Sequence, residues 1–128
     1  MTYQYNDGGM IAAGYKKPKK DCVVRAIAIA TQMTYAETND LINQVAGKDV
    51  DARNNGVNKK VWKDLMKQLG WTWTPTMLVG SGCKVHLVAN ELPMGRLVVS
   101  VSKHLTGMID GVIHDVYPNV ARGGKRAV

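Results

Sequence analysis

The sequence predicts an α+β domain in which N-terminal helices pack on a C-terminal antiparallel sheet. Between residues 22 and 70, apolar side chains recur at helical spacing between residues that start and stop helices. From residue 71 onward the pattern changes to short β-branched runs separated by turn sequences. Helices followed by strands in this order are typical of the α+β class. We see no repeat or linker and expect a single domain over residues 1–128, long enough to build a core.

The first helix is predicted to follow an irregular, basic leader, residues 1–20. Turn-forming glycines, several lysines and Pro18 make a helix unfavourable there. Asp21 is then a suitable N-cap, whose carboxylate would accept a hydrogen bond from an amide of the first turn. The helix would run over residues 22–32, with Cys22 as its first residue. Because it is apolar on nearly all sides, we expect it to be buried at the centre of the fold.

Two further helices are predicted from their end signals. Thr34 and Glu37 have the spacing of a capping box, which opens a helix that Gly47 ends. A polar loop is expected over residues 48–56. The next helix, over residues 58–70, carries apolar side chains at i, i+4 and i+8 and ends at a glycine.

The second half of the chain predicts strands. Asp110-Gly111 is the signature of a two-residue hairpin turn between two of them. The tail, residues 119–128, is expected to be loosely held. The predicted strand segments are residues 71–79, 85–88, 96–102, 105–109 and 112–117.

Charge and composition limit the functional classes. The formal net charge of +7 indicates either an anionic partner, such as nucleic acid or an acidic host protein, or a role in solubility alone. No apolar run is long enough to span a membrane and no secretory signal is visible, so we expect a cytoplasmic protein without membrane contact. Both cysteines would then be free thiols. A basic patch is expected around the start of the first helix: Lys16, Lys17, Lys19, Lys20 and Arg25.

Cys22 is the first candidate for chemistry. A thiol at a helix N-terminus lies near the positive end of the helix dipole, and neighbouring basic residues add to that field. Both effects favour the thiolate, which is the nucleophilic form. The alternative is an inert cysteine that packs as a small apolar residue.

The predicted hairpin supplies two partners. If Asp110 and Gly111 are the loop residues, the ladder places His104 and Asp115 as diagonal neighbours on one face of the sheet. Asp115 could then orient the His104 ring while the other ring nitrogen faces a thiolate. His114 would point to the opposite face.

A helix-head cysteine, a histidine on a strand and an aspartate on the next strand follow the logic of a catalytic triad. In this order, the chain resembles the papain-like cysteine peptidase superfamily, and especially its compact NlpC and bacteriocin-processing types. The resemblance implies a papain-like fold and a hydrolase or acyltransferase that acts on a peptide or protein amide through a thioester, with Cys22 as nucleophile, His104 as general acid and base, and Asp115 as its orienting group. It needs no cofactor or metal.

The papain-like resemblance also implies an oxyanion hole. Its donors would be the Cys22 amide and a side chain upstream, for which Gln4 and Asn6 are the candidates. A closer likeness is to small phage and prophage proteins, which implies a viral origin and, with it, the host cytoplasm. The segments that carry it are Asp21-Cys22-Val23-Val24-Arg25-Ala26, Gly80-Ser81-Gly82-Cys83-Lys84-Val85-His86-Leu87 and Asp110-Gly111-Val112-Ile113-His114-Asp115.

Other functions stay open on the sequence. The protein could be a phage accessory factor without catalysis that binds a host protein or nucleic acid through its basic surface. Cys83 and His86 form one closely spaced pair of possible zinc ligands, and Cys22 could join them at a zinc ion. A structural zinc site usually has two such pairs, and the sequence shows one. Trp71 and Trp73 would share one face of a strand, as part of a core, a groove wall or a base-stacking platform.

Overall fold

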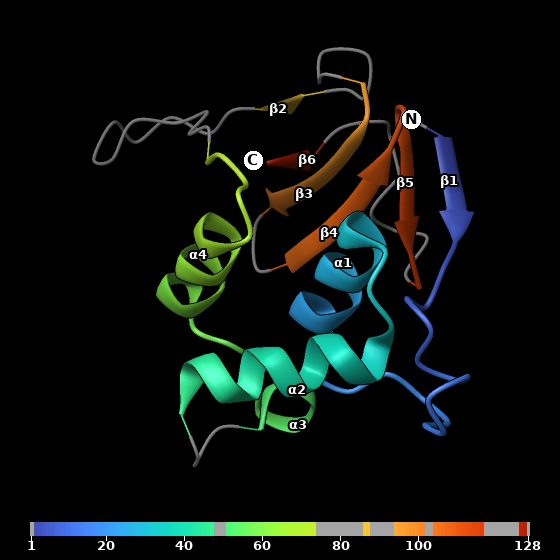
Figure 1. Cartoon of the computed structure of the whole chain (residues 1–128). Helices are drawn as coiled ribbons and strands as arrows, with labels where there is room; N and C mark the ends of the chain where they lie inside the picture. The colour runs from blue at the N-terminus through green and yellow to red at the C-terminus, as the bar shows by residue number, and fades with distance from the viewer. Residues whose placement is uncertain are drawn as a thin grey trace.

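The computed structural model describes residues 2–47, 51–73, 86–87, 94–101, 104–116 and 126–127, and all that follows concerns these residues. They contain helices and strands in the order that the α+β prediction requires, apart from one strand at the N-terminus (Figure 1). The elements are β1 (Thr2–Tyr5), α1 (Cys22–Thr31), α2 (Tyr35–Ala46), α3 (Ala52–Asn55), α4 (Lys59–Gln68), β2 (His86–Leu87), β3 (Arg96–Val101), β4 (His104–Ile109), β5 (Val112–Asp115) and β6 (Arg126–Ala127).

The main sheet has four strands in the order β1-β5-β4-β3. Strands β3, β4 and β5 pair antiparallel, as expected, but β1 lies parallel to β5 at the edge of the sheet. The prediction that the whole leader is irregular is therefore wrong at its start. The four residues of β1 form a strand because β5 offers them an open edge, a long-range partner that local pattern does not reveal.

The β4–β5 hairpin confirms the predicted turn and register. Ile109 pairs with Val112, and the loop residues Asp110 and Gly111 have φ angles of 48° and 82°. Positive φ at both positions is the requirement of a type I′ turn, which matches the twist of the two strands. The Asp110 carboxylate also accepts a hydrogen bond from the Gly95 amide at 2.8 Å, which ties the turn to the start of β3.

Helix α1 is the buried central helix that the sequence predicts. It begins at Cys22 and ends at Thr31, where Gln32 takes a left-handed conformation. Its residues from Val23 to Ala30 are all buried, and the helix packs against β4 (Figure 1). Gly107 on β4 makes this approach close, because a Cβ there would lie 3.0 Å from Cγ2 of Ile29.

The remaining helices surround α1. Helix α2 contacts both α1 and α4 (Figure 1). The Thr34 hydroxyl accepts a hydrogen bond from the Glu37 amide, and Asn58 caps α4 in the same way through the Lys60 amide. The expected polar loop contains the short helix α3, because the Asp51 carboxylate caps it by accepting from the Asn54 amide.

Two predictions in the C-terminal half are wrong. Residues 71–73 are not a strand, and Trp73 packs edge-on against Trp62 of α4, with 5.8 Å between the ring centroids. The tail is not wholly loose, because β6 pairs antiparallel with β2, itself inside the predicted strand 85–88. Residues 74–79 of the predicted strand lie outside the described part of the chain.

Asp21 occupies the predicted N-cap position but does not cap the helix. Its carboxylate is fully buried and forms ion pairs with Arg25 and Arg53, the latter at 3.0 Å. It also accepts hydrogen bonds from the Tyr35 hydroxyl at 2.6 Å and from the Lys19 amide at 3.1 Å. Two guanidinium groups satisfy a buried carboxylate better than one helix amide does, so these partners replace the local cap.

Candidate functional site

Cys22 is the first residue of α1, the helix that contacts both β4 and β5. Its side chain is partly buried against the core. The side chain of His104 and the backbone of Leu105 interact with this thiol and lower its pKa. The helix N-terminus and the first residues of β4 thus meet at one sulfur atom.

The His104 ring is held from its other side by Asp115. Nε2 of His104 lies 2.6 Å from Oδ2 of Asp115, as the hairpin geometry predicts. The His104 side chain is 15 % exposed and the Asp115 side chain 4 %, so solvent competes little with this pair. Nε2 is thus the ring nitrogen that the carboxylate engages.

Asp115 is itself fixed by two donors. The Thr106 hydroxyl donates to Oδ2 at 2.7 Å, and the Val116 amide donates to Oδ1 at 2.7 Å. The side chains of Thr106 and His104 stand on the same face of β4 because they are two residues apart. Both carboxylate oxygens therefore have a fixed partner, and the orientation of the imidazole is fixed with them.

The electrostatics of the site favour an ion pair between sulfur and ring. Burial raises the pKa of the Cys22 thiol, but the hydrogen bonds from His104 and Leu105 and the positive charges of His104 and Arg25 outweigh it, and the pKa is lowered. Burial likewise lowers the pKa of His104, but Asp115 and Cys22 raise it to about 9. These opposite shifts favour thiolate and imidazolium together at neutral pH.

A cleft of about 310 Å³ opens at Cys22. Its wall contains Cys22 and His104, and two lysines of the leader also line it. The residues that line it are Lys19, Lys20, Cys22, Val23, Arg25, Gly56, Val57 and His104. A substrate can therefore reach the sulfur and the ring from one open side.

The structure does not bring the predicted upstream oxyanion donors to this cleft. The Asn6 amide contacts Nδ1 of His114 at 3.1 Å, and its carbonyl oxygen accepts from the Gly8 amide. The Gln4 side-chain amide donates to the carbonyl of Tyr5. Gln4 pairs with His114 in the β1–β5 register, and Asn6 contacts the His114 ring. His114 and Asp115 are successive residues of β5, so their side chains point to opposite faces of the sheet. Of the three predicted donors, only Cys22 lines the cleft.

The structure places four of the five residues of the predicted basic patch at the surface. Lys16, Lys17, Lys19 and Lys20 are exposed. Arg25 is 3 % exposed and is paired with Asp21, so it belongs to the buried cluster under α1 and not to the surface. Its charge acts on Cys22 from within the protein.

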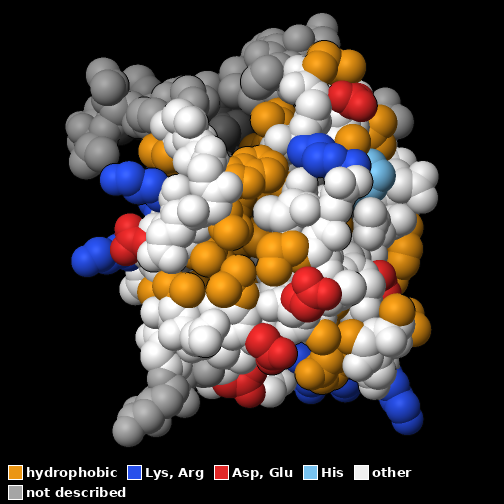
Figure 2. Space-filling model, in the orientation of Figure 1, with side chains coloured by type: hydrophobic (Ala, Val, Ile, Leu, Met, Phe, Trp, Pro, Cys, Tyr) orange, Lys and Arg blue, Asp and Glu red, His pale blue; other side chains and the backbone are white. Residues whose placement is uncertain are grey.

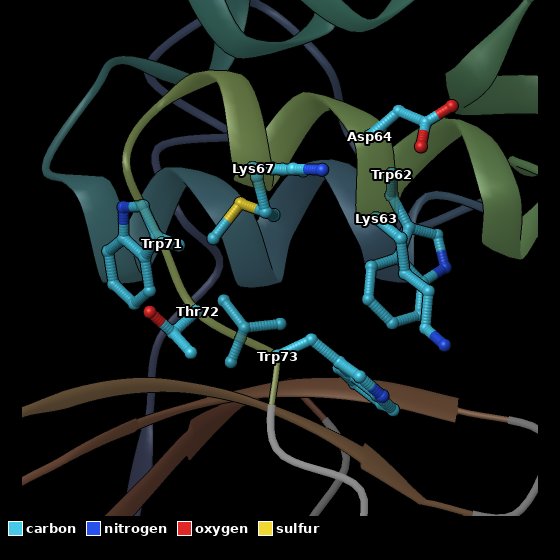
Figure 3. Close-up of a pocket in the computed structure, with 9 residues that line it drawn as sticks. Trp62, Lys63, Asp64, Lys67, Trp71, Thr72 and Trp73 are labelled. Carbon is cyan, nitrogen blue, oxygen red and sulfur yellow. The ribbon is translucent and has the colours of Figure 1, made fainter.

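A second recess lies between α4 and β3. It has a volume of about 500 Å³, and Figure 3 shows indole rings and lysine side chains around it. Figure 2 shows apolar side chains gathered between α4 and α1 on this side of the molecule. Trp73 is 44 % exposed, with Nζ of Lys63 at 4.0 Å and Nζ of Lys59 at 5.3 Å from its ring centroid. The lining residues are Trp62, Lys63, Asp64, Met66, Lys67, Trp71, Thr72, Trp73 and Val98.

The predicted hairpin register also places Thr106 opposite Asp115 and on the same face as His104, but sequence reasoning assigned Thr106 no role in the site. The cleft wall formed by Gly56 and Val57 was missed. No local signal connects Gly56 and Val57 with Cys22, because only the packing of the loop before α4 brings them there.

Among the described residues, no group of three His, Cys, Asp or Glu side chains could hold a metal ion. Cys83, a member of the hypothetical zinc set, lies outside that part of the chain. Where the structure is described, no helix has the length and apolar character needed to cross a membrane. Comparison of the chain with protein-family models, curated proteins and solved structures finds no match.

Proposed function

We propose that the protein is a cysteine-dependent hydrolase or acyltransferase with a papain-like arrangement, acting on a peptide or protein amide. The observation that carries the proposal is the imidazole of His104, held between the Cys22 sulfur and the Asp115 carboxylate. A nucleophile, a base and a group that orients the base, each within hydrogen-bonding reach of the next, are the parts that acyl transfer requires.

The proposed reaction proceeds in two halves. The Cys22 thiolate attacks the amide carbon, and the His104 imidazolium gives its proton to the departing amine, which leaves a thioester. In hydrolysis, water then attacks the thioester carbon while His104 removes its proton, and the acid product and the thiolate are released. An amine in place of water gives acyl transfer. The backbone amide of Cys22 is the proposed first donor to the oxyanion.

Alkylation of Cys22 by iodoacetamide over a range of pH tests the proposal, in a Cys83→Ser background. We expect the rate to rise with a midpoint well below the ordinary thiol pKa of ~8.5, because the thiolate is paired with an imidazolium. His104→Ala should move that midpoint up to ~8.5 or above, since burial then acts without the opposing charge. Asp115→Asn should give an intermediate midpoint.

His114→Ala is the matched control, because His114 lies in the same hairpin but contacts Asn6 rather than Cys22. It should leave the midpoint unchanged. In the parent, the midpoint could instead lie near that of a free thiol and stay unchanged in the His104→Ala variant. This result would mean that His104 does not activate Cys22, and it would overturn the proposal.

A second candidate function, binding of single-stranded nucleic acid, is favoured by the recess between α4 and β3. Its exposed Trp73 ring and the lysines around it provide stacking and phosphate contacts, the two components of such sites. The net charge of +7 fits the same partner.

Fluorescence anisotropy of a labelled oligothymidylate, measured against salt, separates the two functions. Nucleic-acid binding as the main function predicts steep salt-dependent binding that Trp73→Ala weakens and Cys22→Ala leaves intact. Lys16→Gln, outside the recess, is the control. Absence of binding at low salt, or equal losses in the Trp73 and Lys16 variants, would remove this candidate.

A further inference from the structure

The cleft at Cys22 carries lysines at its mouth and no acidic residue among those that line it. Lys19 and Lys20 are exposed and immediately precede Asp21. The inference drawn from this rests on the proposed function of Cys22 and concerns the chemical class of its substrate.

The backbone positions of both lysines are fixed. The Lys19 amide donates to Oδ1 of Asp21, whose carboxylate is fully buried. Lys20 lies beside Gly56, where a Cβ added to Gly56 would be 3.7 Å from the Lys20 carbonyl oxygen and 3.9 Å from the Lys20 Cβ. Both lysines are exposed and line the cleft, so their backbone is held in place while their side chains are open to solvent.

The other positive groups of the cleft already have negative partners. Arg25 is paired with Asp21, and His104 is paired with Asp115 and faces the Cys22 sulfur. Within the described residues, no salt bridge involves Lys19 or Lys20. The charge available to a ligand at this site is thus the charge of these lysines.

We infer that the cleft at Cys22 selects substrates that carry a carboxylate close to the carbonyl carbon that reacts. An amide bond within an acidic peptide segment is such a substrate. Lys19 and Lys20 would bind that carboxylate while the carbonyl carbon lies at the sulfur of Cys22. They act as specificity-determining residues, and the chemistry stays with Cys22 and His104.

A pair of alkylating agents that differ in charge tests this inference without a known substrate. Iodoacetate carries a carboxylate beside its reactive carbon, and iodoacetamide carries a neutral amide there. The ratio of their rate constants at Cys22, in the Cys83→Ser background at low ionic strength, reports how strongly the cleft favours the anion. We expect Lys19→Gln/Lys20→Gln to lower this ratio about threefold to tenfold, and salt to lower it in the parent.

The control variant Lys16→Gln/Lys60→Gln removes the same net charge at two exposed positions that do not line the cleft. Its ratio should stay close to that of the parent. An unchanged ratio in the Lys19/Lys20 variant, or an equal fall in the control, would overturn the inference. Failure of the proposed function would look different, because iodoacetamide alone would then react slowly and without dependence on His104.

Discussion

At the residue scale, the site depends on a chain of hydrogen bonds that begins at Thr106. Thr106 and the Val116 amide fix the Asp115 carboxylate, Asp115 fixes the His104 ring, and His104 faces Cys22. Each link orients the next, and burial of Thr106 and Asp115 keeps water from replacing them. Thr106 is therefore a positioning residue for the proposed reaction.

Replacing Thr106 by Val should lower the alkylation rate of Cys22 at pH 7 by about fivefold, because an Asp115 carboxylate with fewer donors holds the His104 ring less firmly. Thr106→Ser, which keeps the hydroxyl, should restore most of the rate. Thr38→Val is the control for loss of a buried threonine hydroxyl, since Thr38 bonds only within the first turn of α2. Equal rates in the Thr106→Val and Thr38→Val variants would contradict the positioning role.

The His104 titration provides a direct check by NMR. We expect its ring to titrate near pH 9 and to remain an imidazolium at pH 7. Asp115→Asn and Cys22→Ser should each lower the pKa, since each removes a negative partner. His114 is an internal control, because burial and the charge of Arg96 lower its pKa.

The same shift makes stability depend on pH. Folding raises the pKa of His104 from 6.5 to about 9. The stabilisation from this shift is therefore complete below about 6.5 and is lost as the pH rises through about 9. Titration of the His104 ring at its ordinary pKa in the NMR experiment would contradict both statements.

At the element scale, the position of Cys22 depends on how closely α1 packs on β4. Gly107 lies under Ile29 with too little room for a side chain, so the helix can approach the strand that carries His104. The packing of α1 on β4 thus depends on a close contact between Ile29, near the end of the helix, and Gly107, inside the strand.

Gly107→Ala should lower the free energy of unfolding by about 1–3 kcal/mol, because the added methyl would lie 3.0 Å from Cγ2 and 3.2 Å from Cβ of Ile29. Urea denaturation of a double-mutant cycle with Ile29→Ala measures the coupling. The cost of the alanine should be smaller when Ile29 has been shortened. Additive effects would show that crowding at Ile29 is not its cause.

At the scale of the whole molecule, the buried cluster around Asp21 joins the leader, α1, α2 and α3. Arg53 donates to Asp21, to the Tyr35 hydroxyl and to the carbonyl of Lys17, and its guanidinium stacks 4.0 Å from the Tyr15 ring centroid. Burial and the Asp21 hydrogen bond raise the pKa of Tyr35, so its hydroxyl stays a donor. The cluster fixes the leader where it enters the cleft.

Arg53→Met should lower the free energy of unfolding by about 3–5 kcal/mol, since Asp21 then stays buried with one cationic partner fewer. Urea denaturation measures the change. Lys60→Met, an exposed position at the start of α4, is the control and should have little effect. A loss of less than about 1 kcal/mol would mean that Arg25 alone neutralises Asp21.

Much of the fold follows from short-range signals. The start of α2 is predicted by its capping box, and Asp110-Gly111 sets the register that places His104 beside Asp115. These predictions are confirmed because each depends on residues that are neighbours in sequence or across one tight turn. The hairpin alone is enough to place the Asp115 carboxylate beside the His104 imidazole.

Predictions that depended on distant partners were wrong or could not be made. Asp21 has the residue type and position of a helix cap, but Arg53 and Tyr35 compete for its carboxylate and win. The N-terminal strand pairs with β5 from the opposite end of the chain, and Asn6 is drawn to His114 instead of Cys22. In each case the local preference is weaker than a tertiary contact.

The sequence by itself determined the α+β class, the helix that begins at Cys22 and the hairpin that joins His104 to Asp115, because hydrophobic periodicity and turn geometry act over a few residues. Only the tertiary structure decided that the sulfur meets the ring, that Thr106 and Val116 hold the carboxylate, and that Lys19 and Lys20 stand at the cleft. Those contacts depend on how α1 packs against β4, and the close approach at Gly107 that sets this packing is a property of the assembled core.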